Sequence, residues 1–420
     1  MLDRSVPPAT QGLSMVAISR PEIEKIDRHI SLMYLHEADV PIVSLELVFQ
    51  SGRLYDTVDD ASYFAAKMLG EGTKSRSAFE LSLSFEELGS FFEIAPGIDT
   101  ISVRLYSLKR NFSKSLEVLK DLLSNPKFDE NDFQQLKAIR KNQILSRLSQ
   151  NNYLASVHFS EHLFGADHPY GRVPDLEKVD ALSLEDIRSY FQDSFFKELK
   201  VILTGDVSGL KDDVASFCKD LGVNGQNSSQ HPIGSTLGDH TIERKDANQA
   251  SVRLGRLTIN RNHKDSHQLS IVNTLFGGFF GSRLMKNIRE EKGLTYGINS
   301  QVVHLREGSY WIISSEVKSE NTAAVHEEIQ KEIDILKNEP PSEAELETLK
   351  NYARGKYLSS MDSTFSIVSL FRPLFLQDHS FDVVEDYLSA LDGIKASDFP
   401  EIVEKYFSPE VRVTVGPATA

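Results

Sequence analysis

The chain contains the same helix-and-strand unit twice, and this repeat limits its possible folds more than any other feature. One copy is an amphipathic segment that opens with a capping Ser183 and leads into a β-branched strand closed by Gly205. The other copy opens with a capping Ser397 and ends at Gly416. The two glycines lie 211 positions apart (416 − 205). This spacing predicts that the second half of the chain repeats the first.

A second pair of matching positions gives nearly the same spacing. One helical pattern stops before Pro126 and the next begins at Asp129, and the same arrangement recurs at Pro340 and Ser342. Proline ends a helix because it lacks the N–H, and Asp and Ser favour helix N-termini. The two prolines lie 214 positions apart (340 − 126). Two independent spacings that agree this closely indicate an internal duplication.

A polar stretch separates the two copies. Residues 221–238 are rich in Gly, Asn and Ser and show no hydrophobic period, which is typical of a linker. We therefore predict an N-terminal domain at 1–222, a linker at 223–240 and a C-terminal domain at 241–420.

Each half mixes strands with helices. Period-two alternation predicts strands, and longer apolar periods predict helices. The expected strands are 42–49, 100–106, 250–257 and 308–315, and the expected helices are 112–123, 130–148, 153–164, 322–337 and 343–359. The sequence therefore predicts an α+β fold made of two homologous mixed-sheet domains.

Composition excludes several classes of protein. The chain has 420 residues and a net charge of −15, which disfavours nucleic-acid binding because phosphate recognition needs a basic surface. Cys218 is the only cysteine, so no internal disulfide can form. No apolar run is long enough for a membrane span, and the N-terminus lacks the layout of a secretory signal. We expect a cytoplasmic location, or a periplasmic one if a leader has been removed.

Residues 60–73 resemble the first core helix of the pitrilysin/insulinase metallopeptidases, which are inverted zincins. The family pattern there is G-L-A-H-F-L-E-H-M-L-F-x-G-T. Five residues keep its register: Phe64, Met68, Leu69, Gly72 and Thr73. In such a helix two histidines on one face bind zinc, and the glutamate beside them activates water. The resemblance implies one half of a clamshell metallopeptidase.

The metal-binding residues of this pattern are absent. Tyr63 and Lys67 stand at the histidine positions, and Ala66 stands at the position of the glutamate. The family's third ligand is a glutamate about 76 residues beyond the second histidine, which falls on Gln143. A phenol and an ammonium group cannot replace neutral imidazoles, and alanine cannot accept a proton. The resemblance thus implies a degenerate zinc site, with no catalytic residue and no metal in this chain.

The second half keeps a different family segment. Residues 289–296, R-E-E-K-G-L-T-Y, match the family pattern R-E-x-x-G-L-x-Y, and residues 276–284 resemble the turn that precedes it. In the family the Arg and the Tyr hold substrate carbonyls opposite the zinc. The resemblance therefore implies that Arg289 and Tyr296 bind substrate. Both groups donate hydrogen bonds and can stabilise an oxyanion.

One strand of the first half resembles the family's peptide-binding strand. It comprises Phe92, Glu93, Ile94 and Ala95. A peptide adds to such a strand through backbone hydrogen bonds, so we expect it at a sheet edge. An ordinary, buried edge strand that binds no peptide is an equally open alternative. We also expect Lys67 to place a positive charge near the position that zinc occupies in the family, the alternative being a solvated surface lysine.

A second candidate zinc string competes with this account. His158, Glu161 and His162 form an H-x-x-E-H pattern on a predicted helix. The Met-Leu-x-x-Gly-Thr signature follows Lys67 instead, and a Glu at the family spacing beyond His162 would fall near Asp239, in the linker. We expect this string not to bind metal. A self-sufficient zinc peptidase that uses it is the minor alternative.

The resemblance as a whole implies a processing-peptidase-like arrangement. This chain would be the catalytically incomplete subunit of a heterodimeric zinc metallopeptidase. A homologous, zinc-bearing partner subunit would supply the metal, and Arg289 and Tyr296 would hold the peptide substrate. The alternatives are a non-proteolytic structural member of the fold and a homodimeric peptide-binding protein.

Overall fold

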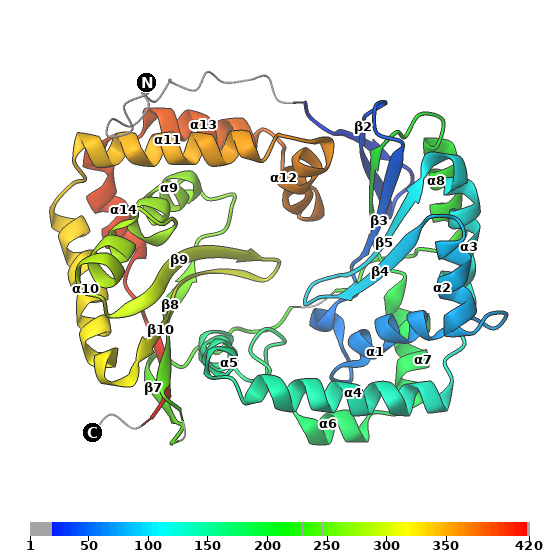
Figure 1. Ribbon diagram of the computed structural model, residues 1–420, viewed down its shortest axis with the longest axis horizontal. Coiled ribbons are helices and arrows are strands. Elements are labelled where there is room, and N and C mark those ends of the chain that lie inside the picture. The colour runs from blue at the N-terminus through cyan, green and yellow to red at the C-terminus, as the bar shows by residue number, and fades with distance from the viewer. Residues whose placement is uncertain (1–18, 229, 246, 418–420) are drawn as a thin grey trace, which may run out of the picture.

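The chain folds into two sheets with helices packed against them. The computed structural model describes residues 19–228, 230–245 and 247–417. Figure 1 shows the N-terminal half on the right and the C-terminal half on the left. The predicted α+β fold with two mixed sheets is confirmed. Within the described ranges, no helix is long and apolar enough to cross a membrane.

The two sheets repeat one strand order. The N-terminal order is β1-β2-β6-β3-β5-β4 and the C-terminal order is β7-β11-β8-β10-β9. The β2–β6 and β7–β11 pairs are parallel, whereas the pairs of β3 with β6 and of β8 with β11 are antiparallel. Apart from the additional β1, the two halves share one topology, which agrees with an internal duplication. The strands are β1 (Glu22–Lys25), β2 (Ile30–His36), β3 (Ile42–Phe49), β4 (Phe91–Pro96), β5 (Ile101–Leu108), β6 (Leu199–Gly205), β7 (Gly238–Glu243), β8 (Gln249–Thr258), β9 (Thr295–Leu305), β10 (Gly308–Lys318) and β11 (Val411–Gly416).

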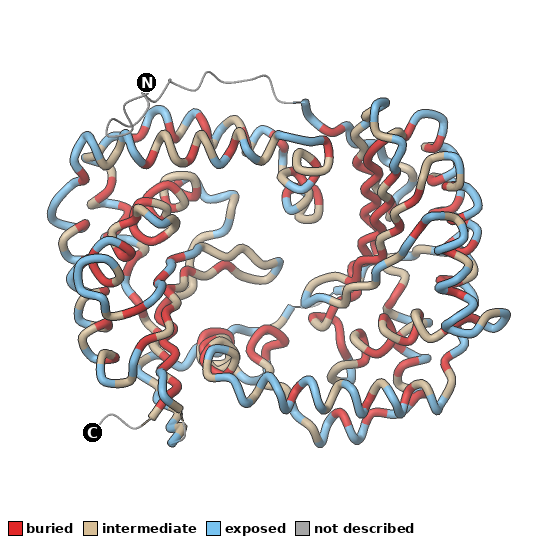
Figure 2. The backbone as a smooth tube through the Cα atoms, viewed as in Figure 1, coloured by how far each residue is buried: buried red, intermediate tan, exposed pale blue. Residues whose placement is uncertain are grey.

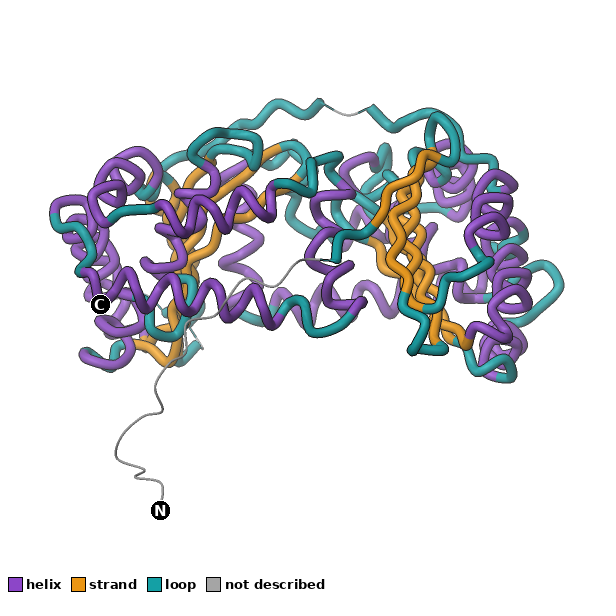
Figure 3. Tube along the Cα trace, turned by 90° about the horizontal axis from the view of Figure 1, so that it is seen from above, coloured by secondary structure: helices purple, strands orange, loops and turns teal. Residues whose placement is uncertain are grey.

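Most helices lie on the outward faces of the two sheets (Figure 3). Their bounds are α1 (Ala61–Met68), α2 (Ala78–Glu86), α3 (Phe112–Ser124), α4 (Glu130–Leu148), α5 (Asn151–Phe164), α6 (Leu176–Ala181), α7 (Leu184–Tyr190), α8 (Lys211–Asp220), α9 (Ser266–Gly277), α10 (Thr322–Asn338), α11 (Glu343–Ser359), α12 (Thr364–Leu376), α13 (Val383–Gly393) and α14 (Phe399–Tyr406). The predicted bounds of α3, α4, α10 and α11 agree to within one residue. The caps at Asp129 and Ser342 are also confirmed, since both side chains accept hydrogen bonds from backbone N–H groups of the first turn.

One of the two repeated helix starts was predicted wrongly. Ser183 does cap α7, with a reciprocal hydrogen bond from its own N–H to Asp186. Ser397 does not cap α14, because it lies inside the short 3₁₀ turn Ala396–Asp398. The carboxylate of Asp398 closes that turn by accepting the N–H of Lys395 at 2.9 Å. The helix therefore starts at Phe399, directly after the turn, and its N-cap position is Asp398, one position beyond the serine.

Each half covers a face of the other half's sheet with one helix. Helix α5 packs on β8 and β11 of the C-terminal sheet, and α12 packs on β2 and β6 of the N-terminal sheet. Strand β6 is buried along its whole length as a result, which Figure 2 shows as continuous red strands in the N-terminal sheet. We call α5 and α12 the exchanged helices. They join the two halves through hydrophobic cores in addition to the linker.

The contact of α12 combines an apolar core with a partly buried ion pair. Phe371 is fully buried in a cluster that includes Met33 of β2 and Ile202 of β6. The guanidinium of Arg372 donates to both carboxylate oxygens of Glu46 on β3, at 2.9 and 2.8 Å. Bidentate pairs of this kind fix orientation as well as adding energy. The pair therefore sets how α12 lies across the N-terminal sheet.

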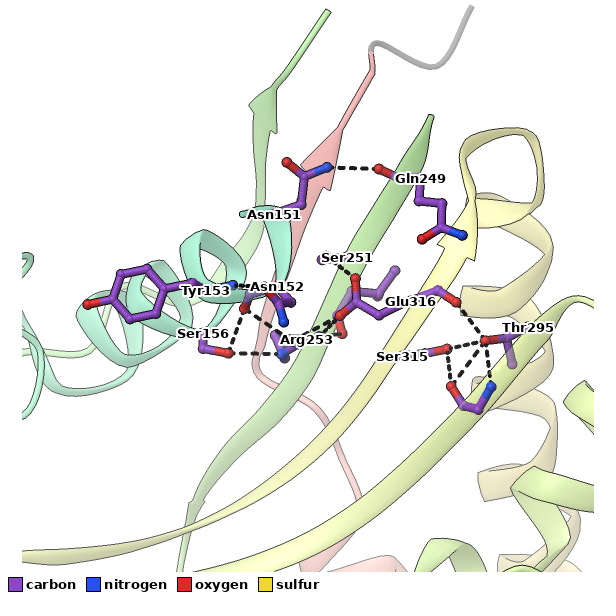
Figure 4. A network of polar contacts seen from close by, with 12 residues as sticks. Asn151, Asn152, Tyr153, Ser156, Gln249, Ser251, Arg253, Thr295, Ser315 and Glu316 are labelled. Carbon is purple, nitrogen blue, oxygen red and sulfur yellow. Dashed lines mark hydrogen bonds and ion pairs between the residues drawn. The ribbon is translucent and has the colours of Figure 1, made fainter. Parts of the chain in front are cut away.

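The contact of α5 depends on a glycine in β8. A Cβ added at Gly255 would lie 2.0 Å from the carbonyl oxygen of Trp311 and 2.9 Å from the ring of Phe159. Phe159 of α5 thus occupies space that any side chain at 255 would need. Arg253, also on β8, donates to Ser156 Oγ and to the carbonyl of Asn152, both at 3.2 Å (Figure 4). The ring and these bonds hold α5 to the sheet.

Replacing Phe371 by alanine is expected to destabilise the whole chain and not only its C-terminal half. Removing a fully buried phenylalanine costs about 3–5 kcal/mol, and this ring stabilises the N-terminal sheet. Denaturant unfolding followed by both fluorescence and circular dichroism should show one transition at a lower midpoint. Phe79→Ala is the matched control, since Phe79 is 75% exposed. Two separate transitions, or a shift no larger than that of the control, would contradict the coupling.

Candidate functional site

Helix α1 carries the positions that correspond to the zinc-binding histidines. The hydroxyl of Tyr63 donates to Oε1 of Gln143 on α4 at 3.2 Å. Lys67, one helical turn later, donates from Nζ to the carbonyl of Ile94 on β4 at 3.2 Å. The fold therefore brings Tyr63 and Gln143 into contact and directs Lys67 toward the predicted peptide-binding strand.

These side chains do not fit a zinc ion. The guanidinium of Arg140 lies over the ring of Tyr63, 4.0 Å from its centroid, and pairs with Asp60. Arg140 and Lys67 thus place two cations where a metal ion would need anionic or neutral ligands. Ala66 is fully buried and offers no proton acceptor. Zinc sites in proteins use thiolates, neutral imidazoles and carboxylates. We therefore derive no chemical step through a metal on this chain.

The side chains of the H-x-x-E-H string on α5 make contacts other than those of a zinc site. Nδ1 of His158 lies 2.8 Å from a carboxylate oxygen of Glu161. The ring of His162 stacks on His240, with ring centroids 3.4 Å apart. Burial, together with the nearby His240, lowers the pKa of His162. Stacked and hydrogen-bonded in this way, the three side chains do not point toward one common position.

In the part of the chain that the structure describes, a different trio comes together. His168, His231 and Glu307 have ligand atoms within 4.8 Å of one another. His168 is only 1% exposed, and its Nδ1 accepts the N–H of Tyr170 at 3.0 Å. A neutral ring then carries its proton on Nε2, which lies 3.5 Å from the Glu307 carboxylate. An N–H, and not a lone pair, faces the other two groups, so they form a polar cluster and not a ready ligand set.

This cluster adjoins a contact between the two halves. The hydroxyl of Tyr170 donates to one oxygen of Asp99 at 2.6 Å, and the N–H of Arg306 donates to the other at 3.3 Å. Burial raises the pKa of Tyr170, and the negative charge of Asp99 adds to this, so the phenol stays protonated and donates. Asp99 lies in the β4–β5 turn and Arg306 in the β9–β10 turn. We call this the hairpin-tip contact, which no pattern in the sequence predicted.

The predicted peptide-binding strand, β4, lies at the edge of its sheet, as expected. It pairs only with β5 among the described strands. Phe91 is 57% exposed and stacks on Tyr106, with ring centroids 4.7 Å apart. Glu93, two residues along on the same face, lies 3.5 Å from Arg104. An aromatic and a charged side chain therefore flank the open edge. Whether a peptide binds there stays a prediction.

Tyr296 lies on β9, an edge strand of the C-terminal sheet, and Arg289 lies on a segment that contacts this strand. Arg289 belongs to a π-helical segment, Met285–Glu291, and its guanidinium lies over the ring of Phe280, 4.7 Å from the centroid. Tyr296 is 83% exposed at the start of β9. Neither side chain makes a hydrogen bond or an ion pair with another described residue. Both are thus available to a ligand.

A polar network fixes the start of β9 (Figure 4). Thr295 donates from Oγ1 to the carbonyl of Glu316 at 2.7 Å and accepts a hydrogen bond from Ser315 at 3.0 Å. The β9–β10 pairing shifts register between Ser315 and Val317, and Tyr296 has no partner in it. A bulge of this kind redirects a side chain. The network therefore anchors the residue next to Tyr296 and leaves the phenol exposed.

Comparison with known proteins agrees with this architecture. Residues 32–164 match the family described as Insulinase (Peptidase family M16), and residues 181–352 match the Peptidase M16 inactive domain. A protein of Bacillus subtilis named an uncharacterized zinc protease is 24% identical, over 78% of this chain and 81% of its own length. A protein of Helicobacter pylori named a non-peptidase homolog is 25% identical, over 71% of each chain.

A solved structure with the same fold is also described as a member of peptidase family M16. A crystal structure of a peptidase M16 inactive domain from Pseudomonas fluorescens superposes with a TM-score of 0.86. It is 21% identical, and the match covers 95% of this chain and 99% of that one. The first match lies within the N-terminal half and contains the four predicted zinc positions. The second match begins near the end of that half and extends into the C-terminal half, where it contains Arg289 and Tyr296. The chain therefore belongs to the insulinase family of metallopeptidases, peptidase family M16.

Proposed function

We propose that this chain is the catalytically incomplete subunit of a heterodimeric zinc metallopeptidase. It holds a peptide substrate for a homologous subunit that carries the zinc. The observation that carries the proposal is that Tyr296 is exposed and Arg289 lies on a segment that contacts β9. Neither side chain has a polar partner among the described residues, and the predicted zinc positions are filled by unsuitable side chains. A purely structural subunit has no need for such hydrogen-bond donors. The name of the Helicobacter relative, a non-peptidase homolog, supports the loss of hydrolysis in one chain alone.

Strand β4 supplies a second part of the proposed substrate site. An extended peptide adds to an open sheet edge through its backbone, while its alternate side chains meet the residues that flank that edge. Phe91 and Glu93 lie on one face of β4 and offer an aromatic and a negative contact. Lys67 contributes a positive charge at Ile94 from the other side. These contacts favour an extended peptide with mixed apolar and charged side chains.

The proposed roles in hydrolysis follow from the chemistry of the two donors. Attack on a peptide carbonyl moves negative charge onto its oxygen. The guanidinium of Arg289 and the phenol of Tyr296 each donate a hydrogen bond, and donors placed in advance stabilise that oxygen. Neither group gives up its proton. The water and the metal that activates it belong to the partner subunit.

The test is to combine this chain with a zinc-bearing family member from the same organism. Hydrolysis of a quenched fluorescent peptide is measured for each chain alone and for the pair, and light scattering gives the mass of the complex. We expect no turnover and no bound zinc for this chain alone, a complex with one copy of each chain, and at least about tenfold more activity for the pair. Serum albumin in place of this chain is the control. Turnover by this chain alone, or no complex, would overturn the proposal.

A peptide-binding protein without an enzymatic partner is the second candidate. The observation that favours it is the same open β4 edge with its exposed Phe91. Binding of an unstructured peptide by this chain alone, measured by fluorescence anisotropy, would support that function when no complex with a zinc-bearing chain forms. A homodimer in solution would be compatible with it.

A further inference from the structure

The C-terminal half contains a cavity of about 570 Å³ that is separate from Arg289 and Tyr296. It lies among α9, β9, α11, α12 and α13, so one of the exchanged helices forms part of its wall. Cavities of this size commonly hold small organic molecules. None of the predicted site residues lines it.

The charge of the cavity wall is opposite to that of the protein. The chain has 61 acidic and 46 basic residues, yet no Asp or Glu lines this cavity. Arg261 and Lys356 do line it. The wall also contains two histidines, His267 and His304. Burial, followed by the charges of Arg261 and His379, lowers the pKa of His304 to about 4, and burial likewise lowers the pKa of His267. Two permanent cations therefore face the cavity.

Among the residues that the structure describes, Arg261 has no anionic partner. Its guanidinium makes no hydrogen bond or ion pair with any described residue, and its Nε is buried without a partner. Burial alone lowers the pKa of Arg261, with no carboxylate to oppose the effect. Arginine nevertheless remains charged in proteins. Arg261 is only partly buried, but a charge that is shielded from water without a partner still costs free energy, and a bound anion would reduce that cost.

A second unpaired group lines the same space. Tyr357 is only 8% exposed, and its hydroxyl is buried with no hydrogen-bond partner among the described residues. Tyr357 lies one residue after Lys356 on α11, and both line the cavity. A buried hydroxyl that lacks a partner is unusual because it loses the hydrogen bonds that water would give. It is a donor available to a ligand in this cavity.

The wall has a polar part, which includes Arg261 and Asn273, and an apolar part. Helices α12 and α13 contribute a continuous aliphatic side that comprises Leu370, Pro373, Leu374, Val383 and Val384. A free phosphate or sulfate ion would leave this side unused. A ligand that satisfies both parts of the wall therefore has one anionic group and one apolar group.

We propose that this cavity binds an organic monoanion, namely a carboxylate joined to a compact apolar group. The planar guanidinium of Arg261 presents parallel N–H groups that match the two oxygens of a carboxylate. The Tyr357 hydroxyl donates a further hydrogen bond, and the aliphatic wall takes the apolar group. Binding here requires neither a partner subunit nor zinc, so it can fail or succeed independently of the proposed peptidase function.

The experiment is calorimetric titration of the whole chain with N-acetyl-leucyl-phenylalanine, as the free acid and as the C-terminal amide. We expect one site per chain for the acid and at least about tenfold weaker binding of the amide. Arg261→Gln should weaken binding of the acid at least about tenfold. Arg110→Gln, at an exposed arginine with no polar partner, should leave it unchanged. Phosphate should not displace the acid.

Other outcomes would overturn the proposal. Equal binding of the acid and the amide, or no binding of either, would contradict the proposed carboxylate site. If phosphate displaces the bound acid at a phosphate concentration lower than that of the acid, the cavity is a site for inorganic anions instead. Tyr357→Phe keeps the ring and should weaken binding of the acid, but not of the amide, by about threefold. Thermal unfolding of each variant shows whether it is folded. If Arg261→Gln disturbs folding, the result for Tyr357→Phe decides the test.

Discussion

In the proposed heterodimer, the double variant Arg289→Gln, Tyr296→Phe is expected to lower kcat by about 10²- to 10³-fold. Each substitution keeps much of the side chain's shape but removes a donor aimed at the carbonyl oxygen. The loss should appear in kcat more than in KM, because the negative charge on that oxygen is fully developed only in the transition state. Steady-state kinetics with a quenched fluorescent peptide gives both constants.

Lys286→Gln is the matched control for this double variant. Lys286 is an exposed cation on the same π-helical segment as Arg289, so its removal changes local charge without removing a proposed substrate contact. Its kcat should stay within about twofold of the unaltered pair. An equal loss in control and double variant would mean that charge alone matters. An unchanged kcat in the double variant would show that the two donors do not act in hydrolysis.

Zinc binding is expected to appear when three residues are changed together: Tyr63→His, Lys67→His and Gln143→Glu. Tyr63 and Gln143 are already in contact at 3.2 Å, and Lys67 lies one turn away on the same helix. The changes supply two imidazoles and a carboxylate and remove one of the two cations. Elemental analysis after dialysis should give about one zinc per chain, against almost none for the unaltered chain.

The same variant should bind zinc without becoming an enzyme. The general-base position is Ala66, which is fully buried, and a glutamate there would place a carboxylate in an apolar core at a cost of several kcal/mol. A control with the same residue types on exposed surfaces, Lys114→His, Lys219→His and Gln134→Glu, should bind no more zinc than the unaltered chain. Equal zinc in variant and control would mean that the degenerate site cannot be rebuilt by its ligands alone.

Local structure was predictable from the sequence because it depends on neighbouring residues. The helices that flank Pro126 and Pro340 follow from their caps and apolar periods, and their bounds agree closely with the structure. The exchange of α5 and α12 was not predictable. The apolar stripe of α5, with Phe159 at its centre, shows that the helix packs on something but not on which sheet. Only the three-dimensional fit against Gly255 decides that.

The site was predictable to the extent that it lies within short segments. Helical spacing places positions 63 and 67 on one face, and the family resemblance supplied position 143. The cavity around Arg261 draws on five separate elements, and the hairpin-tip contact joins Asp99 to Arg306 across 207 positions. No short segment of the sequence contains all the residues of the cavity or of the hairpin-tip contact. The polar cluster of His168 was missed for the same reason.

Among the described residues, the exchanged helices and the hairpin-tip contact join the two halves of the chain. Each sheet is clamped by a helix from the opposite half, and the turns at the two open edges are tied through Tyr170. A peptide enclosed between two such subunits enters and leaves when the subunits themselves move apart. The gate of the proposed enzyme is then its quaternary interface. Substitutions that tighten this interface would slow product release, and the turnover rate would follow the lifetime of the closed dimer.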